Sequence, residues 1–269
     1  MVADGAVELN LIGQETSGYG RDIEGGPSLA GLLRELEQLS DLEWVRVLYS
    51  HPATMTDEIV EAMGQCRKVA PYLDLPLQHI SDPILAAMGR RVTRAQTERL
   101  LERLREAMPE VALRTTVIVG FPGETPEQFE EMLAFIRAAR FACLGAFVYS
   151  PEEGTAAAKL PGRVEPEEAQ RRYEAVMLTQ QEVAFAEADK LLGRELPCLV
   201  TDVLSAEEAA ELGLAGEAVW LVGRLDRQAP EIDPVTYVAS RPGQEVEAGI
   251  MPVRMRGRMG YDLVAELVR

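Results

Sequence analysis

The fold is decided most clearly by residues 113–128, which read LRTTVIVGFPGETPEQ. The first seven residues are a run rich in β-branched side chains, which suits a strand buried on both faces of a parallel sheet. After the turn at 120–123, Thr125 and Gln128 have the spacing of a capping box, with Pro126 at the first helical position. A buried strand, a turn and a helix start in immediate succession predict one βα unit.

The same alternation extends on both sides of this unit, from residue 7 to residue 192. Apolar runs predict strands, and apolar residues at helical spacing predict helices. The expected strands are 7–12, 44–49, 72–77 (bounded by Pro71 and Pro76), 113–119 and 143–149. The expected helices are 29–39, those beginning at Thr56, Thr93 and Thr125, and one at about 165–192. This order predicts an α/β fold with a parallel sheet, arranged as a partial TIM-like (βα) barrel.

The pattern changes after Gly193, where short apolar runs are separated by Gly, Pro and Asp turns. The expected strands are 196–203, 219–222, 235–238, 245–253 and 262–268, and they predict a small β-barrel. The segment 206–217 is rich in Ala, Glu and Gly and is expected to be an insertion or an exposed loop. We therefore place a domain boundary at 192/193, between domains 1–192 and 193–269.

The composition predicts a globular, acidic protein. The chain has 269 residues, 47% of them hydrophobic, and a formal net charge of −17. Such a charge repels a polyanion such as RNA and attracts a basic partner, although an acidic surface can equally serve solubility alone. No apolar run long enough for a membrane span and no basic, apolar leader is present, so we expect no membrane association and a cytoplasmic location.

The three cysteines do not have the spacing of a metal site. Cys66, Cys143 and Cys198 are too far apart in sequence for a ligand motif or a disulfide framework. Each is most simply a small buried residue.

The residues that could carry chemistry follow the predicted strands, because ligands of a parallel α/β barrel bind at the carboxyl ends of its strands. These segments are 13–16, 50–52, 78–79, 120–125 and 150–155. Both histidines of the chain, His51 and His79, lie in them. They are candidates for acid–base or substrate-positioning roles, whereas a metal site would need a third ligand at fixed spacing.

Two further patterns in these segments have ordinary structural explanations. Gly120 to Gly123 lets the backbone approach a ligand closely but lacks the Lys-Ser/Thr of a phosphate-binding loop. It can equally be a βα turn capped by Thr125. Glu152 and Glu153 could be paired catalytic carboxylates, or simply solvated side chains of a loop.

Taken in order, the strand-end segments resemble the consecutive signatures of the radical S-adenosylmethionine methylthiotransferases. The matching stretches are 11–16 (LIGQET), 19–22 (YGRD), 72–81 (YLDLPLQHIS), 118–125 (IVGFPGET) and 149–155 (YSPEEGT). In the second domain, 223–224 (GR), 229–233 (APEID) and 261–264 (YDLV) resemble the family's TRAM domain, an OB-like barrel. The resemblance covers nearly the whole chain.

The family has two relevant branches, one that modifies an adenosine of transfer RNA and one that modifies an aspartate of ribosomal protein uS12. Segment 78–81 (QHIS) and segment 229–233 resemble the second branch. Charge agrees: residues 193–269 hold 8 Arg and no Lys against 13 Asp and Glu, a net −5 that is unfavourable for RNA phosphates. The resemblance thus implies uS12, a basic protein, as the partner, and disfavours nucleic acid as the direct substrate.

The resemblance also implies a mechanism and two cofactors, S-adenosylmethionine and 4Fe-4S clusters. A reduced cluster cleaves S-adenosylmethionine to a radical that takes a hydrogen atom from the β-carbon of the aspartate, and a methylthio group is then inserted. The family binds this cluster through a Cys-x-x-x-Cys-x-x-Cys loop after the first barrel strand. This sequence lacks that loop, so we expect a barrel without its first strand, no metal-binding residues, and a fragment that is inactive alone.

The matching positions assign the S-adenosylmethionine site. Gln14 and Glu15 correspond to the segment that holds the methionine amino group, while Gln78, His79 and the backbone from Gly120 to Gly123 would line the ribose and adenine. No catalytic residue is assigned. Two alternatives stay open: a transfer-RNA methylthiotransferase, and a non-catalytic remnant that binds a basic ribosomal protein.

Overall fold

The structure is a computed structural model that describes residues 1–214, 216, 218–241 and 248–268. The chain divides into two compact units, Met1–Val183 and Ala184–Arg269, and the division falls within helix α6 (Pro166–Asp189). The domain boundary proposed at 192/193 follows the end of that helix. Within the described part of the chain, no helix has both the length and the apolar character needed to cross a membrane.

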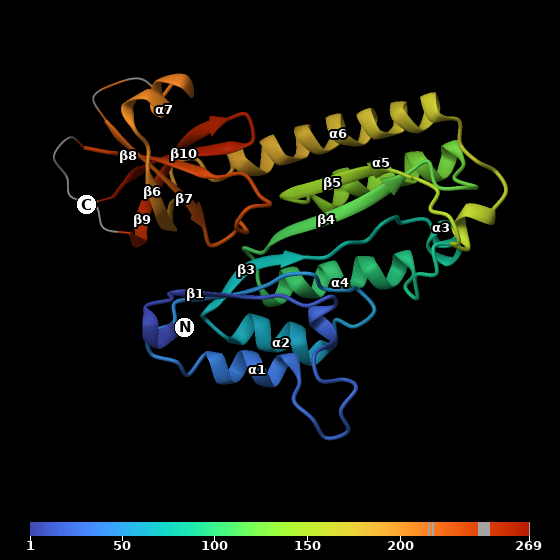
Figure 1. Ribbon diagram of the computed structural model, residues 1–269, viewed down its shortest axis with the longest axis horizontal. Helices are drawn as coiled ribbons and strands as arrows, with labels where there is room; N and C mark the ends of the chain where they lie inside the picture. The colour runs from blue at the N-terminus through green and yellow to red at the C-terminus, as the bar shows by residue number, and fades with distance from the viewer. Residues whose placement is uncertain (215, 217, 242–247, 269) are drawn as a thin grey trace. The chain divides into compact units, whose positions relative to one another are not determined.

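The first unit is built on a five-stranded parallel sheet in the order β1-β2-β3-β4-β5 (Figure 1). The strands are β1 (Glu8–Leu11), β2 (Trp44–Val47), β3 (Val69–Asp74), β4 (Ala112–Val119) and β5 (Cys143–Val148). The helices are α1 (Leu29–Leu36), α2 (Asp57–Gln65), α3 (Asp82–Ala87), α4 (Arg94–Ala107), α5 (Pro126–Ala139) and α6. Because every pair of neighbouring strands in this sheet is parallel, all five carboxyl ends lie on one edge, as in a TIM-like barrel.

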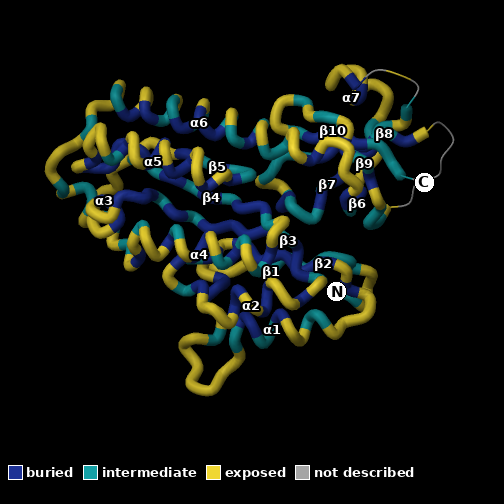
Figure 2. The backbone as a smooth tube through the Cα atoms, turned by 180° about the vertical axis from the view of Figure 1, so that it is seen from behind, coloured by how far each residue is buried: buried dark blue, intermediate teal, exposed yellow. Residues whose placement is uncertain are grey.

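Local sequence chemistry explains the unit around β4. Leu113, Val117 and Val119 are buried and belong to the main hydrophobic core. β4 lies between β3 and β5 in the sheet, and Figure 2 shows it buried or half-buried along most of its length. At the start of α5, the Thr125 hydroxyl accepts a hydrogen bond from the backbone N–H of Gln128. In return, the side-chain oxygen of Gln128 accepts one from the backbone N–H of Thr125. The predicted βα unit and its capping box are therefore confirmed. The expected burial on both faces of the strand was wrong, because Arg114, Thr116 and Ile118 alternate with the buried residues and are only partly buried.

The third strand differs from its prediction. We expected residues 72–77 with Pro71 outside the strand, but β3 spans Val69–Asp74 and contains Pro71. The register of β3 against β2 shifts between the pairs Val45–Val69 and Val47–Leu73, so Pro71 lies in an irregularity where its missing N–H costs no ladder bond. After Asp74 the chain leaves the pairing with β2 and runs on alongside β4 without regular strand structure: the Leu75 amide donates to the Arg114 carbonyl (2.9 Å), and Gln78 forms an isolated parallel bridge with Val117.

The described residues of the second unit form a closed β-barrel in the order β10-β8-β7-β6-β9. Its strands are β6 (Glu195–Val203), β7 (Val219–Leu225), β8 (Thr236–Ser240), β9 (Gly249–Met259) and β10 (Asp262–Leu267). The barrel interior holds Cys198, Leu221, Leu225, Val238, Val253 and Met255. The prediction of a small carboxyl-terminal β-barrel is confirmed.

The expected loop 206–217 begins as a helix, α7 (Ala206–Glu211), because Ser205 and Glu208 form a capping box and Ala209 packs with Tyr237. The loop prediction was wrong for these residues. The predicted strand 245–253 begins among residues 242–247, which lie outside the described residues, and its described part is the start of β9.

Candidate functional site

The turn after β1 is tied to the turn after β2 by hydrogen bonds. The Thr16 amide donates to the Tyr49 carbonyl (3.0 Å), and the His51 amide donates to Ser17 Oγ (2.9 Å). Gln14 and Glu15 directly precede these anchors and are exposed. The segment that carries Gln14 and Glu15 is thus held beside the end of β2.

Asp74 ties the end of β2 to the end of β3. Its Oδ2 accepts a hydrogen bond from the Tyr49 amide (3.2 Å), and its carbonyl accepts one from the Ser50 amide (3.0 Å). Its Oδ1 lies 3.7 Å from Nε of Arg114 on β4. Asp74 therefore links three neighbouring strands at the carboxyl edge, a role that the sequence did not reveal because its partners are distant in sequence.

Gln78 adopts an unusual backbone conformation at the same edge. Its φ of 71° lies in the left-handed region, which non-glycine residues rarely occupy. Two backbone hydrogen bonds fix it there: the Gln78 amide donates to the Thr116 carbonyl (2.8 Å), and the Ile118 amide donates to the Gln78 carbonyl (2.7 Å). These bonds attach the backbone of Gln78 to β4, and the Gln78 side chain is half-buried there.

His79 belongs to a buried polar cluster. Its Nδ1 accepts a hydrogen bond from the Ser81 amide (3.0 Å), so Nε2 carries the proton and donates to Glu124 Oε1 (3.2 Å). Glu124 Oε2 also accepts from the Gly120 amide and pairs with Arg172 Nη1 of α6 (3.0 Å). These contacts explain the burial of His79 without a ligand, and its role in ligand binding stays a prediction.

The glycine turn after β4 is shaped by packing as well as by any ligand. Gly120 has a φ of 72°, and a Cβ built on it would lie 2.7 Å from the Cβ of Ala169 on α6. The Gly123 amide donates to the Gly162 carbonyl (2.8 Å). Both positions therefore have intramolecular roles, and their predicted contact with the ribose and adenine remains untested.

Three ionisable groups around these turns interact electrostatically. Burial, with a smaller contribution from Arg90, holds the pKa of His51 below its ordinary value, while Glu15 opposes the shift. Burial also lowers the pKa of Arg90, again opposed by Glu15. Arg90 Nη2 donates to the Pro76 carbonyl (2.9 Å). Glu15 after β1, His51 after β2 and Arg90 in the loop between α3 and α4 therefore interact electrostatically near one edge of the sheet.

This edge fits a polar organic ligand. The Ser50 hydroxyl at the end of β2 and the Tyr149 hydroxyl at the end of β5 are buried with no hydrogen-bond partner among the described residues. Unsatisfied buried hydroxyls are costly, and a ligand with several donors and acceptors would satisfy them. Glu15 adds an exposed carboxylate that can receive an ammonium group.

The residues present do not fit an iron–sulfur cluster. Cys66 ends α2, Cys143 begins β5 and Cys198 lies inside the second unit's barrel, so the three thiols are on separate elements. Burial raises the pKa of Cys66 and raises that of Cys198 to about 12, which disfavours the thiolate that clusters need. No group of three or more His, Cys, Asp or Glu in the described ranges could hold a metal ion.

The two units match two family models. Residues 4–136 match the radical SAM superfamily, and residues 192–268 match the TRAM domain. The structure of coproporphyrinogen III oxidase from Escherichia coli, a radical SAM enzyme, aligns with 70% of this chain and 47% of that protein, at a TM-score of 0.52 and 17% identity. Fold and sequence therefore define the class: a radical SAM core joined to a TRAM barrel.

Curated relatives place the chain more narrowly. Ribosomal protein uS12 methylthiotransferase RimO of Geobacter sulfurreducens is 43% identical over 268 residues, which is 100% of this chain and 57% of that protein. The protein of the same name from Moorella thermoacetica is 45% identical over 242 residues, 90% of this chain and 52% of that protein. The chain belongs to the radical S-adenosylmethionine methylthiotransferase family, and it spans little more than half the length of these relatives.

Proposed function

We propose that this chain supplies the S-adenosylmethionine-binding edge and the TRAM barrel of an enzyme that adds a methylthio group to the β-carbon of an aspartate of uS12. The observation that carries this proposal is the likeness to uS12 methylthiotransferases along the whole chain. S-adenosylmethionine supplies the radical chemistry of this family, and the residues of this chain bind and orient it.

Each strand-end residue has a defined part in the proposed site. The exposed Glu15 carboxylate, with Gln14 beside it, receives the methionine ammonium group, because a carboxylate–ammonium hydrogen bond is the strongest polar contact available there. Gln78, His79 and the backbone of Gly120 to Gly123 lie against the ribose and adenine. The hydrogen bonds that join the turn after β1 to the turn after β2, and that turn to the last residue of β3, support this assignment because they hold these segments together without a ligand.

The electrostatics favour a basic protein partner. The chain carries −17 overall, and its segment 193–269 carries a net −5. An acidic surface accelerates association with a basic protein such as a ribosomal protein and opposes binding to RNA phosphates. This charge supports uS12 over transfer RNA as the substrate.

The proposal is tested in a chimera that provides the part of the relatives outside the alignment. The aligned 268 residues of the Geobacter sulfurreducens protein are replaced by this chain, and the chimera is expressed in cells that lack their own enzyme. Mass spectrometry of uS12 should detect one methylthio group on an aspartate. Modified adenosine in transfer RNA instead, or no modification of either, would contradict the proposal.

A matched pair of variants tests the binding role within the chimera. Glu15→Gln should lower S-adenosylmethionine affinity by about tenfold, because it removes one charge-assisted hydrogen bond. Glu24→Gln is the control, since Glu24 is also exposed and lies nine residues along the chain from Glu15. Equal effects of the two substitutions would refute the assignment of Glu15.

A further inference from the structure

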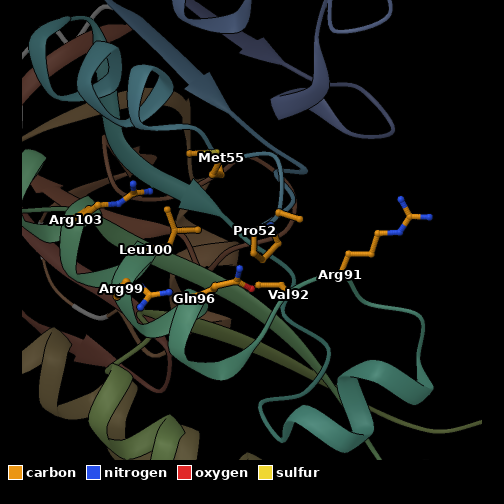
Figure 3. A pocket seen from close by; sticks show the side chains of 9 residues that line it. Pro52, Met55, Arg91, Val92, Gln96, Arg99, Leu100 and Arg103 are labelled. Atoms are coloured by element: carbon orange, nitrogen blue, oxygen red, sulfur yellow. The ribbon is translucent and has the colours of Figure 1, made fainter.

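A separate cavity lies near helix α4 in the first unit, with a volume of about 320 Å³. Pro52 and Met55, from the segment between β2 and α2, contribute apolar surface, and Leu100 of α4 adds more (Figure 3). None of the residues predicted to bind S-adenosylmethionine lines it. We call it the α4 cavity.

One face of α4 brings hydrogen-bond donors to the α4 cavity. Gln96, Arg99 and Arg103 line it and are spaced three and four residues apart, so they project from the same side of the helix. Figure 3 shows Arg99 and Arg103 at one end of the cavity and Arg91 at the opposite end, extending away from them. Two guanidinium groups and an amide thus border one small space.

Arg99 and Arg103 differ in their surroundings: the Arg99 side chain is exposed to solvent, and Arg103 is half-buried. Arg99 has no hydrogen bond or ion pair with any residue that the structure describes. Arg103 pairs with Asp57, but its Nε is buried without a hydrogen-bond partner among the described residues. A buried, unpartnered guanidinium nitrogen is costly, and a ligand oxygen would satisfy it.

The charge of the α4 cavity is opposite to that of the chain. The chain carries −17, whereas the cavity lining includes Arg91, Arg99 and Arg103 and, among the described residues, no acidic side chain. Guanidinium groups match carboxylate and phosphate oxygens in geometry. Arginines concentrated around one hollow of an acidic protein therefore indicate an anion-binding site.

We propose that the α4 cavity binds a small phosphate-bearing molecule of about nucleotide size. A phosphate group offers three oxygens and up to two charges, which suits the donors of Arg99, Arg103 and Gln96 better than the two oxygens of a carboxylate. The apolar surface of Pro52, Met55 and Leu100 accommodates the organic part. The volume is at the lower end of small-molecule sites, and the overall negative charge opposes a long RNA strand.

The test is a calorimetric titration of the full chain with uridine monophosphate at low ionic strength. Uracil is chosen because S-adenosylmethionine carries adenine, so the proposed cofactor site does not favour this probe. Uridine without phosphate and inorganic phosphate alone should each bind at least tenfold more weakly, and excess S-adenosylmethionine should leave the affinity unchanged. Failure of the S-adenosylmethionine proposal would not alter these results.

Three variants locate the site. Arg99→Gln should weaken binding by about tenfold or more, whereas Arg67→Gln, at an exposed arginine of the same unit outside the cavity lining, should leave it unchanged. Asp57→Asn should strengthen binding severalfold, because it removes the charge that competes for Arg103. A gain in affinity in Asp57→Asn could not be explained by partial unfolding of the variant, because unfolding would weaken binding.

The proposal is overturned if uridine monophosphate shows no saturable binding at millimolar concentration. It is also overturned if Arg99→Gln and Arg67→Gln behave alike, or if S-adenosylmethionine displaces the probe. Binding of a single-stranded RNA oligomer without binding of the mononucleotide would show an extended RNA surface instead of a small-molecule site.

Discussion

Replacing Arg172 with methionine tests the buried cluster that joins α6 to the turn after β4. The Arg172 side chain is 5% exposed and pairs with Glu124, whose side chain is 0% exposed. Methionine keeps much of the apolar stem that packs near Phe129 but removes the charge. The substitution leaves the Glu124 carboxylate buried, with His79 and the Gly120 amide as its remaining partners among the described residues.

Breaking one side of a buried ion pair costs roughly 3–5 kcal/mol. For a protein of this size that corresponds to a fall in Tm of roughly 10 °C. Circular dichroism melting and urea titration at pH 7 measure both quantities. Arg171→Met is the matched control on the same helix, since the Arg171 side chain is 72% exposed, and it should change Tm by less than about 2 °C.

A double substitution separates the ion pair from general packing. Combining Arg172→Met with Glu124→Gln removes both charges, so the combined loss of stability should fall short of the sum by about 1–3 kcal/mol. Strict additivity, or a loss for Arg172→Met no larger than for Arg171→Met, would refute the assignment of a coupled buried pair.

Three further outcomes are expected. Gly120→Ala should cost about 2–4 kcal/mol of stability in urea titration, because the residue is left-handed and its Cβ would meet Ala169, whereas Gly154→Ala, left-handed but open, should cost about 1 kcal/mol. The folded-state pKa of His51 lies below 6.5, so the unfolded chain binds its proton more readily; stability should fall as pH drops below about 6.5, and less so in His51→Gln, measured by Tm across pH. Cys198, with a pKa of about 12, should resist iodoacetamide at pH 8 until the protein unfolds, while the partly exposed Cys143 reacts first in peptide mapping.

Local signals made most of the fold predictable from sequence. The capping boxes at Thr93 and Thr125 and the apolar run of β4 depend on neighbours within a few residues, and all three are present. Pro71 inside β3 was not predictable, because the irregularity that accommodates it is a property of the pairing with β2. The short helix α7 was missed although Ser205 and Glu208 have capping-box spacing, since six residues form a helix only when tertiary packing supports them.

The candidate site was predictable only in part. The order of strands and helices alone was enough to place Gln14, Glu15 and Gln78 after parallel strands. The segment that carries Gln14 and Glu15 is held beside the end of β2, as that order implies. The contributions of Asp74 and Glu124 could not be read from sequence. Each acts through partners that only the folded sheet brings near, such as Tyr49 for Asp74 and Arg172 for Glu124.

Hydrogen–deuterium exchange of the full chain, with and without S-adenosylmethionine, shows whether the segments at the carboxyl ends of β1 to β4 form a single binding site for this ligand. Exchange should slow together in segments 13–18, 49–51, 78–81 and 120–124, and stay unchanged along the cavity-lining face of α4. Protection confined to one of these turns, or found only elsewhere in the chain, would contradict the account.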